Sequence, residues 1–331
     1  MIRATDFSRC LATVVGYGNM GREYVRALSI LGVKKIRVCS RSRRPLPELE
    51  AMGSVEVIFG SLEDLRCSPI DSDHELAIVA TPISTLVAVS ENLALLGFRR
   101  LLVEKPISLW SAEIGKLADS LERQGVHAAC AYNRVAYPSF VEARARSERE
   151  GGITSGSYTF TEIVKTDWPQ RFPPEELARW GVANSLHVMS MAHGLIGLPA
   201  KWSGYRSGAI SWHPAGSIFA GSGISVQGIP FIYHADWSSK GRWSVEIHTR
   251  EASYRLCPLE KLFRKRTATG EWEEVAVVSV AAEAKPGVLE QVAAMLAPEV
   301  GCPVPLMDLR RTLALTTYAE DILGYSAGDG C

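Results

Sequence analysis

The sequence predicts an α/β protein of two domains, because its hydrophobic pattern changes once along the chain. In the first part, short apolar runs such as "ATVV" and "ELAIVA" alternate with segments of helical periodicity. That alternation favours a parallel sheet with helices on both faces. Beyond about residue 133, runs such as "WSVEIH" alternate apolar and polar residues between Gly- and Ser-rich turns, which is typical of antiparallel strands. We therefore expect a parallel-sheet domain at 1–134 and a second α/β domain with a mainly antiparallel sheet at 135–331.

The first domain is expected to alternate strands and helices in chain order. The helix that begins near Met20 places Tyr24, Leu28 and Leu31 on one face and stops at Gly32. Strands are expected at 12–18, 34–40, 55–60, 75–80, 100–105 and 126–132, and further helices at 84–97 and 111–125.

The second domain begins with a helix and continues mainly with strands. Helices are expected at 139–150, at about 175–195, at 287–296 and at 306–323, and strands at 155–164, 216–228, 229–239, 242–249 and 252–259. The stretch at 261–278 reads as a hairpin that turns at "ATGE". The sheet is therefore expected to have its helices on one face.

Composition excludes several classes of protein. The 331 residues have a formal net charge of zero and a pI of about 7, whereas nucleic-acid and membrane surfaces need a basic excess. No apolar run approaches the ~20 residues that span a bilayer. The seven cysteines are scattered without a C-x-x-C pair, which favours reduced thiols in a cytoplasmic protein over disulfides or a zinc site.

The segment "VVGYGNMG" contains Gly16, Gly18 and Gly21 in the G-x-G-x-x-G spacing, after a predicted strand and at the start of a predicted helix. In this context the first glycine permits a tight turn, the second lets a pyrophosphate approach the backbone, and the third allows close helix–sheet packing. The helix N-terminus adds amide donors. We therefore expect a dinucleotide at this loop, in contact also with Tyr17, Asn19 and Met20.

The end of the second strand distinguishes NAD from NADP. An NAD site usually carries Asp or Glu there, whereas this chain has "RVCSRSRR". Ser40, Arg41 and Arg44 can bind a 2′-phosphate, and no carboxylate is present to repel it. NADP(H) is therefore the expected cofactor, in preference to NAD(H). The alternative is that some of these arginines, Arg43 included, lie in a solvated loop.

Four stretches in this order, "GYGNMG", "VATPISTL", "VEKPISL" and "AYNRVAYPSF", together with a helix carrying His187, resemble the Gfo/Idh/MocA family of NAD(P)-dependent oxidoreductases. This is the glucose–fructose oxidoreductase and inositol dehydrogenase group. The resemblance implies a Rossmann dinucleotide-binding domain followed by an α/β domain with a large open sheet. Because that sheet commonly joins subunits in the family, we expect a homodimer or homotetramer.

The E-K-P tripeptide is the most specific part of the resemblance. It implies that Lys105 is catalytic and contacts both cofactor and substrate, while Glu104 orients Lys105 and the cofactor. Pro106 independently favours an extended Lys105 at the strand end. The alternative is a strand that ends at the surface with two solvated charges. The resemblance also places Ala80, Thr81 and Pro82 at the nicotinamide ribose and Asn133 and Arg134 at cofactor and substrate, whereas Leu86 stands where many members have His.

The helix "VANSLHVMSMAHGLIG" departs from the family pattern. His187 is present as the second predicted catalytic residue, but Ala183 stands where the family has a catalytic aspartate. Asn184 cannot act as a base, although its amide could bind a sugar hydroxyl. The alternative for His187 is a buried structural histidine, and its spacing to His193 does not fit a helical metal pair, so no metal site is expected.

Aromatic and basic residues precede this helix in "KTDWPQRFPPEELARW". The flat faces of aromatic rings suit a sugar ring, although large aromatic residues more often serve packing. The candidates here are Trp168, Arg171 and Trp180. The expected substrate-binding residues are Lys105, Arg134, Trp168, Asn184 and His187.

Together these observations predict hydride transfer between NADP(H) and a carbonyl or carbinol carbon of a sugar, cyclitol or sugar nucleotide. The expected activity is that of a ketosugar reductase, with Lys105 as proton donor assisted by His187. Two alternatives remain: an imine reductase, and a non-catalytic dinucleotide-binding regulator of the same fold, which the missing aspartate favours. The sequence does not identify the substrate.

Overall fold

The computed structural model describes residues 5–41, 46–50, 52–67, 69–72, 74–279, 283–298 and 304–325. They form two compact units. The first comprises Met1–Ser108, Glu113–Asn133 and Ser279–Arg310, and the second comprises Leu109–Ala112, Arg134–Val278 and Arg311–Cys331. No helix in the described part of the chain is long and apolar enough to cross a membrane.

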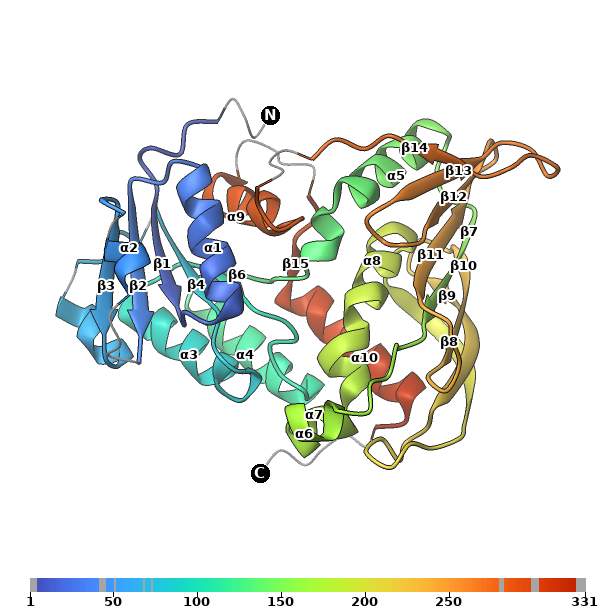
Figure 1. Cartoon of the computed structure of the whole chain (residues 1–331), viewed down its shortest axis with the longest axis horizontal. Helices are drawn as coiled ribbons and strands as arrows, with labels where there is room; N and C mark the ends of the chain where they lie inside the picture. The colour runs from blue at the N-terminus through green and yellow to red at the C-terminus, as the bar shows by residue number, and fades with distance from the viewer. Residues whose placement is uncertain are drawn as a thin grey trace. The chain divides into compact units, whose positions relative to one another are not determined.

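The first unit is built on a seven-stranded sheet in the order β15-β6-β5-β4-β1-β2-β3 (Figure 1). All neighbouring pairs are parallel except β15–β6. In the centre, Val14 pairs with both Val38 and Ile78. The strands are β1 (Leu11–Val15), β2 (Lys35–Ser40), β3 (Val55–Phe59), β4 (Glu75–Val79), β5 (Arg100–Val103), β6 (His127–Cys130) and β15 (Met307–Asp308).

Helices cover both faces of this sheet, as the sequence predicts. Leu76 and Ile78 of β4 belong to a core cluster with residues of α1 and α9. Their neighbours Ala77 and Val79 are buried outside that cluster, where α3 contacts β4 and β5. The helices are α1 (Asn19–Ile30), α2 (Pro47–Glu50), α3 (Ile83–Leu96), α4 (Ser111–Arg123) and α9 (Val288–Leu296), with a 3₁₀ segment at Leu62–Cys67.

The second unit contains an eight-stranded sheet in the order β14-β13-β12-β11-β7-β10-β9-β8 (Figure 1). Its pairs are antiparallel except β7–β10, and the predicted hairpin forms from β13 and β14. The strands are β7 (Ser155–Phe160), β8 (Pro199–Ser207), β9 (Ile218–Ser225), β10 (Pro230–Asp236), β11 (Trp243–His248), β12 (Ser253–Leu256), β13 (Leu262–Lys265) and β14 (Glu273–Val275).

The helices of the second unit lie on one side of its sheet (Figure 1). They are α5 (Pro138–Arg149), α6 (Trp168–Arg171), α7 (Pro174–Ala178), α8 (Leu186–Ile196) and α10 (Leu309–Leu323). Helix α8 approaches β7 closely, since a Cβ at Gly156 would lie 2.5 Å from Cδ1 of Ile196. The prediction of one helix at 175–195 is wrong in detail: α7 ends early, and a π-helical turn at Gly181–Ser185 precedes α8. Gly181, a weak helix former, stands at this break.

Candidate active site

The glycine loop after β1 has the geometry that its spacing predicts. Gly16 has a φ of +96°, and a Cβ there would lie 2.5 Å from the carbonyl oxygen of Ala80. A Cβ at Gly21 would lie 2.1 Å from the carbonyl oxygen of Gly16. Gly18, in contrast, would meet nothing within 4 Å. Gly16 and Gly21 are therefore required by packing, and Gly18 leaves the loop open on the side from which a phosphate can approach.

Two cationic side chains lie near the N-terminus of α1. Gly18 is its N-cap residue, and its first turn contains no acidic residue. The Lys285 ammonium lies 3.0 Å from Sδ of Met20 in that turn, and the Arg22 guanidinium lies 5.3 Å from the centre of the Tyr17 ring. Sequence analysis missed Lys285, because it comes from a segment 265 residues further along the chain.

Asn133 holds the segment that carries Lys285. Its buried side-chain amide donates a hydrogen bond to the carbonyl oxygen of Pro286 at 3.0 Å. Asn133 follows β6, so it ties the turn before α9 to the end of the sheet. This hydrogen bond indicates that Asn133 helps to position Lys285. The sequence predicts a different role for Asn133, a direct contact with the cofactor.

The predicted 2′-phosphate site lies at the end of β2. Ser40 is partly buried and Arg41 is exposed, whereas Arg44 and Arg43 lie outside the described residues. Burial raises the pKa of Cys39, in this strand, to about 11, and the charge of Asp64 adds to that shift. Asp64 lies in the segment after β3. Its carboxylate accepts the backbone N–H of Ser61 at 2.7 Å.

Glu104 and Lys105 follow β5 directly. The Tyr24 hydroxyl donates to Oε1 of Glu104 at 2.5 Å, and the backbone N–H of Lys105 donates to Oε2 at 3.3 Å. Burial raises the pKa of Glu104, while the Tyr24 hydrogen bond and the charges of Lys105 and Lys285 oppose that shift. Glu104 is therefore an anchored carboxylate and not a solvated one. The Lys105–Pro106 peptide bond is cis.

The T-P loop after β4 packs against the glycine loop. Ala80 supplies the carbonyl oxygen beside Gly16, the Thr81 hydroxyl accepts from that of Thr85 at 3.0 Å, and Pro82 is the N-cap of α3. Leu86 is fully buried. The cofactor-binding candidates of the first unit thus gather at the carboxyl ends of β1, β4, β5 and β6, where open α/β sheets bind nucleotides.

In the second unit, the π-helical turn and α8 present the other candidates. Wide helical turns of this kind are frequent at functional sites. Ala183 is buried, Asn184 is partly exposed, and His187 is 8% exposed with its ring 6.2 Å from that of Trp243.

A small cavity of about 270 Å³ lies beside this turn in the second unit. Three of the predicted substrate-binding residues line it, whereas His187 is not among its lining residues and its ring lies 6.2 Å from that of Trp243, which is. Its lining combines aromatic faces with both signs of charge. The lining residues are Arg134, Thr161, Glu162, Ile163, Trp168, Asn184, Arg242, Trp243, Leu259 and Glu260.

Glu162 is a residue of this cavity that sequence analysis missed. It is 4% exposed, and it accepts hydrogen bonds from the Asn184 amide at 3.1 and 3.3 Å and from the Ser185 hydroxyl at 2.6 Å. A signal was present in the sequence. The buried residues of β7 are Gly156, Tyr158 and Phe160, and Glu162 continues their alternation as a carboxylate directed inward.

Arg134 lies at the same cavity with its guanidinium 4.9 Å from the centre of the Trp243 ring. Desolvation lowers its pKa, and the nearby Tyr137, Glu260 and Glu162 oppose that shift. Its Nε atom is buried and has no hydrogen-bond partner among the described residues. A buried donor of this kind favours a ligand that accepts a hydrogen bond.

The remaining aromatic candidates serve mainly packing. Trp168 lines the cavity, but it is 7% exposed and its ring lies 4.4 Å from that of Trp180. Arg171 is exposed and pairs with Asp167 at 3.3 Å. His193 is buried, with Nδ1 2.9 Å from the carbonyl oxygen of Gly197, and desolvation lowers its pKa to about 4.

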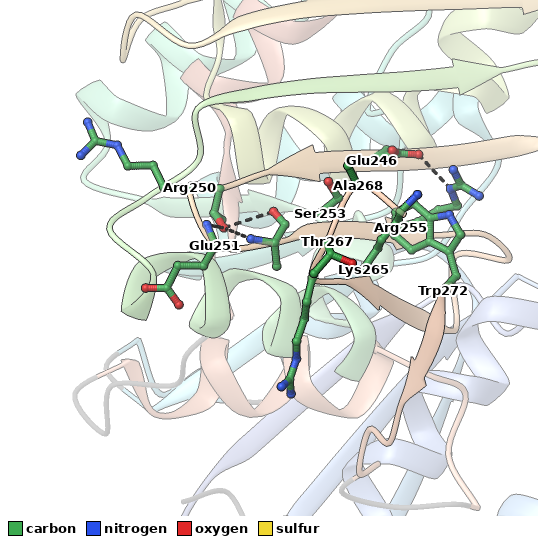
Figure 2. Close-up of a pocket in the computed structure, with 12 residues that line it drawn as sticks. Glu246, Arg250, Glu251, Ser253, Arg255, Lys265, Thr267, Ala268 and Trp272 are labelled. Atoms are coloured by element: carbon green, nitrogen blue, oxygen red, sulfur yellow. Dashed lines mark hydrogen bonds and ion pairs between the residues drawn. The ribbon is translucent and has the colours of Figure 1, made fainter. Parts of the chain in front are cut away.

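A second hollow, of about 390 Å³, lies at β11–β13 of the same unit (Figure 2). Half of its lining residues are charged. Among them, Arg255 pairs with Glu246 at 2.8 Å and lies 4.0 Å from the Trp272 ring. None of the predicted site residues lines it. We therefore place the candidate substrate site at the smaller cavity.

The parallel sheet, the glycine loop and the anchored Glu104 define the first unit as the nucleotide-binding domain of an oxidoreductase. Residues 11–132 match the Gfo/Idh/MocA model, described as "Oxidoreductase family, NAD-binding Rossmann fold". This domain therefore belongs to the Gfo/Idh/MocA family, which confirms the resemblance seen in its motifs and the prediction of an NAD(P)-dependent oxidoreductase. No significant match was found among curated protein sequences.

Solved structures resemble the chain over almost its whole length. An oxidoreductase from Agrobacterium radiobacter in complex with NAD⁺, L-tartaric acid and magnesium covers 97% of each chain at 14% identity, with a TM-score of 0.75. A putative NADPH-dependent oxidoreductase from Desulfitobacterium hafniense covers 95% of each chain at 14% identity, with a TM-score of 0.75. The similarity to UDP-N-acetylglucosamine 3-dehydrogenase from Acidithiobacillus ferrooxidans covers 95% of this chain and 96% of that chain at 14% identity, with a TM-score of 0.70. These similarities confirm the two-domain fold.

Proposed function

We propose that this protein is an NADP(H)-dependent oxidoreductase that transfers a hydride to or from a carbonyl or carbinol carbon of a sugar, cyclitol or sugar nucleotide, most simply as a ketosugar reductase. The observation that carries the proposal is the anchored Glu104–Lys105 pair in a domain of the Gfo/Idh/MocA family. The similarity to UDP-N-acetylglucosamine 3-dehydrogenase and to a levoglucosan dehydrogenase solved with NADH supports a sugar-like substrate.

In the reductive direction, NADPH supplies the hydride when it is bound. Lys105 donates a proton to the oxygen of the substrate carbonyl as charge develops there, and Glu104 fixes the backbone of Lys105 through its N–H. His187, the second predicted catalytic residue, assists this proton transfer. Oxidation follows the same path in reverse, with Lys105 as the proton acceptor.

The reaction is tested by Lys105→Ala. Turnover should fall by roughly 10²–10⁴-fold, the usual scale for a positioned acid–base group. NADPH affinity should change little, because the glycine loop and the basic residues supply most of that binding. Lys105→Met, which keeps the length of the side chain without its charge, should behave like alanine. Steady-state rates with NADPH and a panel of ketosugars, with one cyclic imine included, decide the matter, and a loss below threefold would refute the role.

We propose that the protein binds NADPH at least tenfold more tightly than NADH. Ser40, Arg41 and Arg44 supply the donors for a 2′-phosphate, and Arg41 is exposed for such a contact. Arg41→Ala should narrow the preference by about 1–3 kcal/mol, the value of one charge-assisted hydrogen bond. Calorimetric titration of both cofactors measures this directly, and tighter NADH binding would overturn the assignment.

The alternative of a non-catalytic regulator is favoured by Ala183, which stands where the family has its catalytic aspartate. A regulator would bind NADPH with comparable affinity and turn over none of the panel, and Lys105→Ala would leave it unaffected. The same titrations and rate measurements therefore separate the two functions.

We also propose a homodimer or homotetramer that forms through the sheet of the second unit. The outward positions of β11 are polar, but β8 to β10 expose Tyr205, Ile224 and Ile232, which are 83%, 39% and 60% accessible. Light scattering at micromolar concentration should show an oligomer, and Ile232→Glu should weaken it because a charge there would face the partner. A wild-type monomer would contradict this proposal.

A further inference from the structure

Glu162 places a buried carboxylate side chain at the cavity of the second unit. Asn184 and Ser185, both neutral, hold it from the π-helical turn. An ionised carboxylate can only accept hydrogen bonds. A ligand group that touches Glu162 must therefore be a donor, such as a hydroxyl.

Arg134 imposes the opposite requirement at the same cavity. A guanidinium can only donate, and the buried Nε of Arg134 has no hydrogen-bond partner among the described residues. A ligand group that touches Arg134 must therefore be an acceptor. The lining balances two arginines, Arg134 and Arg242, against two carboxylates, Glu162 and Glu260.

We propose that Glu162 and Arg134 together bind hydroxyl groups of the substrate, so that this cavity selects an uncharged polyol over an anionic one. A hydroxyl both donates and accepts, and neighbouring hydroxyls on one ring can satisfy both residues at once. A carboxylate could satisfy Arg134, but the charge of Glu162 would repel it. The rings of Trp168 and Trp243 offer apolar faces to the ring carbons.

This inference rests on the proposed function and narrows its substrate class. It makes Glu162 a specificity-determining residue for a site to which helix α8 contributes no carboxylate. It also gives Asn184 and Ser185 a positioning role, because their hydrogen bonds fix the carboxylate that meets the substrate.

The experiment compares neutral sugars with their uronates on the full-length protein in the presence of NADP⁺. D-Glucose, D-galactose, D-xylose and myo-inositol are titrated by thermal shift beside D-glucuronate and D-galacturonate. Wild-type protein should bind at least one neutral probe, with at least tenfold weaker binding of the uronates. A uronate that binds more tightly than its neutral partner would overturn this inference and leave the proposed oxidoreductase standing. Binding of none of the six would also overturn this inference, whereas the proposed oxidoreductase is judged separately by turnover of the ketosugar panel.

Two variants then assign the effect to Glu162. Glu162→Gln should weaken the neutral probe at least tenfold and remove most of its advantage over the uronate, because the repelling charge is gone. Glu175→Gln is the matched control, since Glu175 is exposed on α7 and does not line this cavity, and its affinities should change less than threefold. Equal effects of the two substitutions would refute the role of Glu162. The melting temperature of each variant without ligand shows whether it folds. If Glu162→Gln does not fold, the comparison of neutral sugars with uronates on the wild-type protein still tests the inference.

Discussion

Replacing Tyr24 with phenylalanine tests how the carboxylate of Glu104, beside the proposed catalytic residue Lys105, is held. Tyr24 is 1% exposed, and its hydroxyl donates to Oε1 of Glu104 at 2.5 Å. A hydrogen bond to a charged group contributes about 1.5–3 kcal/mol, and phenylalanine preserves the packing of the ring. We therefore expect Tyr24→Phe to lower the free energy of unfolding by about 1.5–3 kcal/mol at pH 8, measured by urea denaturation.

The loss should depend on pH in a defined direction. Because burial raises the pKa of Glu104 above its ordinary value of 4.5, the native protein binds this proton more tightly than the unfolded chain does. The stability that the group contributes is therefore greatest below pH 4.5 and is lost as the pH rises through the folded-state pKa. Removing the Tyr24 hydroxyl raises that pKa further. The destabilisation should thus shrink toward about 0.5–1.5 kcal/mol at pH 5, the value of a neutral hydrogen bond.

Tyr205→Phe is the matched control, because Tyr205 is 83% exposed on β8. Its effect should stay within about 0.5 kcal/mol at both pH values. A loss for Tyr24→Phe that is equal at pH 5 and pH 8, or no larger than that of the control, would refute the reasoning. The first outcome would mean that Glu104 does not ionise in this range, and the second that the hydroxyl does not hold it.

Three further predictions follow from the two units. Lys285→Ala should raise the Kd for NADPH about tenfold at low salt and less at high salt, with Lys285→Arg near wild type, as calorimetry can measure. Gly21→Ala should lower the melting temperature sharply because its Cβ would meet the Gly16 carbonyl oxygen at 2.1 Å, whereas Gly18→Ala should melt near wild type and lose NADPH affinity. Because desolvation lowers the pKa of His193 from 6.5 to about 4, stability should fall by about 3 kcal/mol as the pH drops from 6.5 to 4, and His193→Phe should remove that dependence in urea denaturation.

Local patterns were sufficient to predict most of the first unit. The alternation of apolar runs with helices predicted the parallel sheet, and the spacing of Gly16, Gly18 and Gly21 predicted a loop in which two glycines are required by packing. These features depend on residues close together in the chain, so periodicity and turn chemistry are enough to find them.

Three features of the structure were not predicted from the sequence. Strand β8 escaped because it is an exposed edge strand in which most residues face solvent, so it lacks the alternation of a half-buried strand. Lys285 escaped because only the folded chain brings it to Met20. The break before α8 escaped because the apolar pattern continues through Gly181–Ser185, while the backbone widens there into a π-helical turn.

The missing aspartate shows why a helix motif alone does not decide the chemistry of this site. Ala183 removes a carboxylate from the helix, and this absence left a non-catalytic regulator open as an alternative to the expected reductase. In the folded unit, the next two residues, Asn184 and Ser185, donate hydrogen bonds to Glu162, which follows β7. A buried carboxylate without such donors would be strongly destabilising, so the polar turn and Glu162 depend on each other. The cavity beside α8 therefore retains a carboxyl group that the helix itself does not encode.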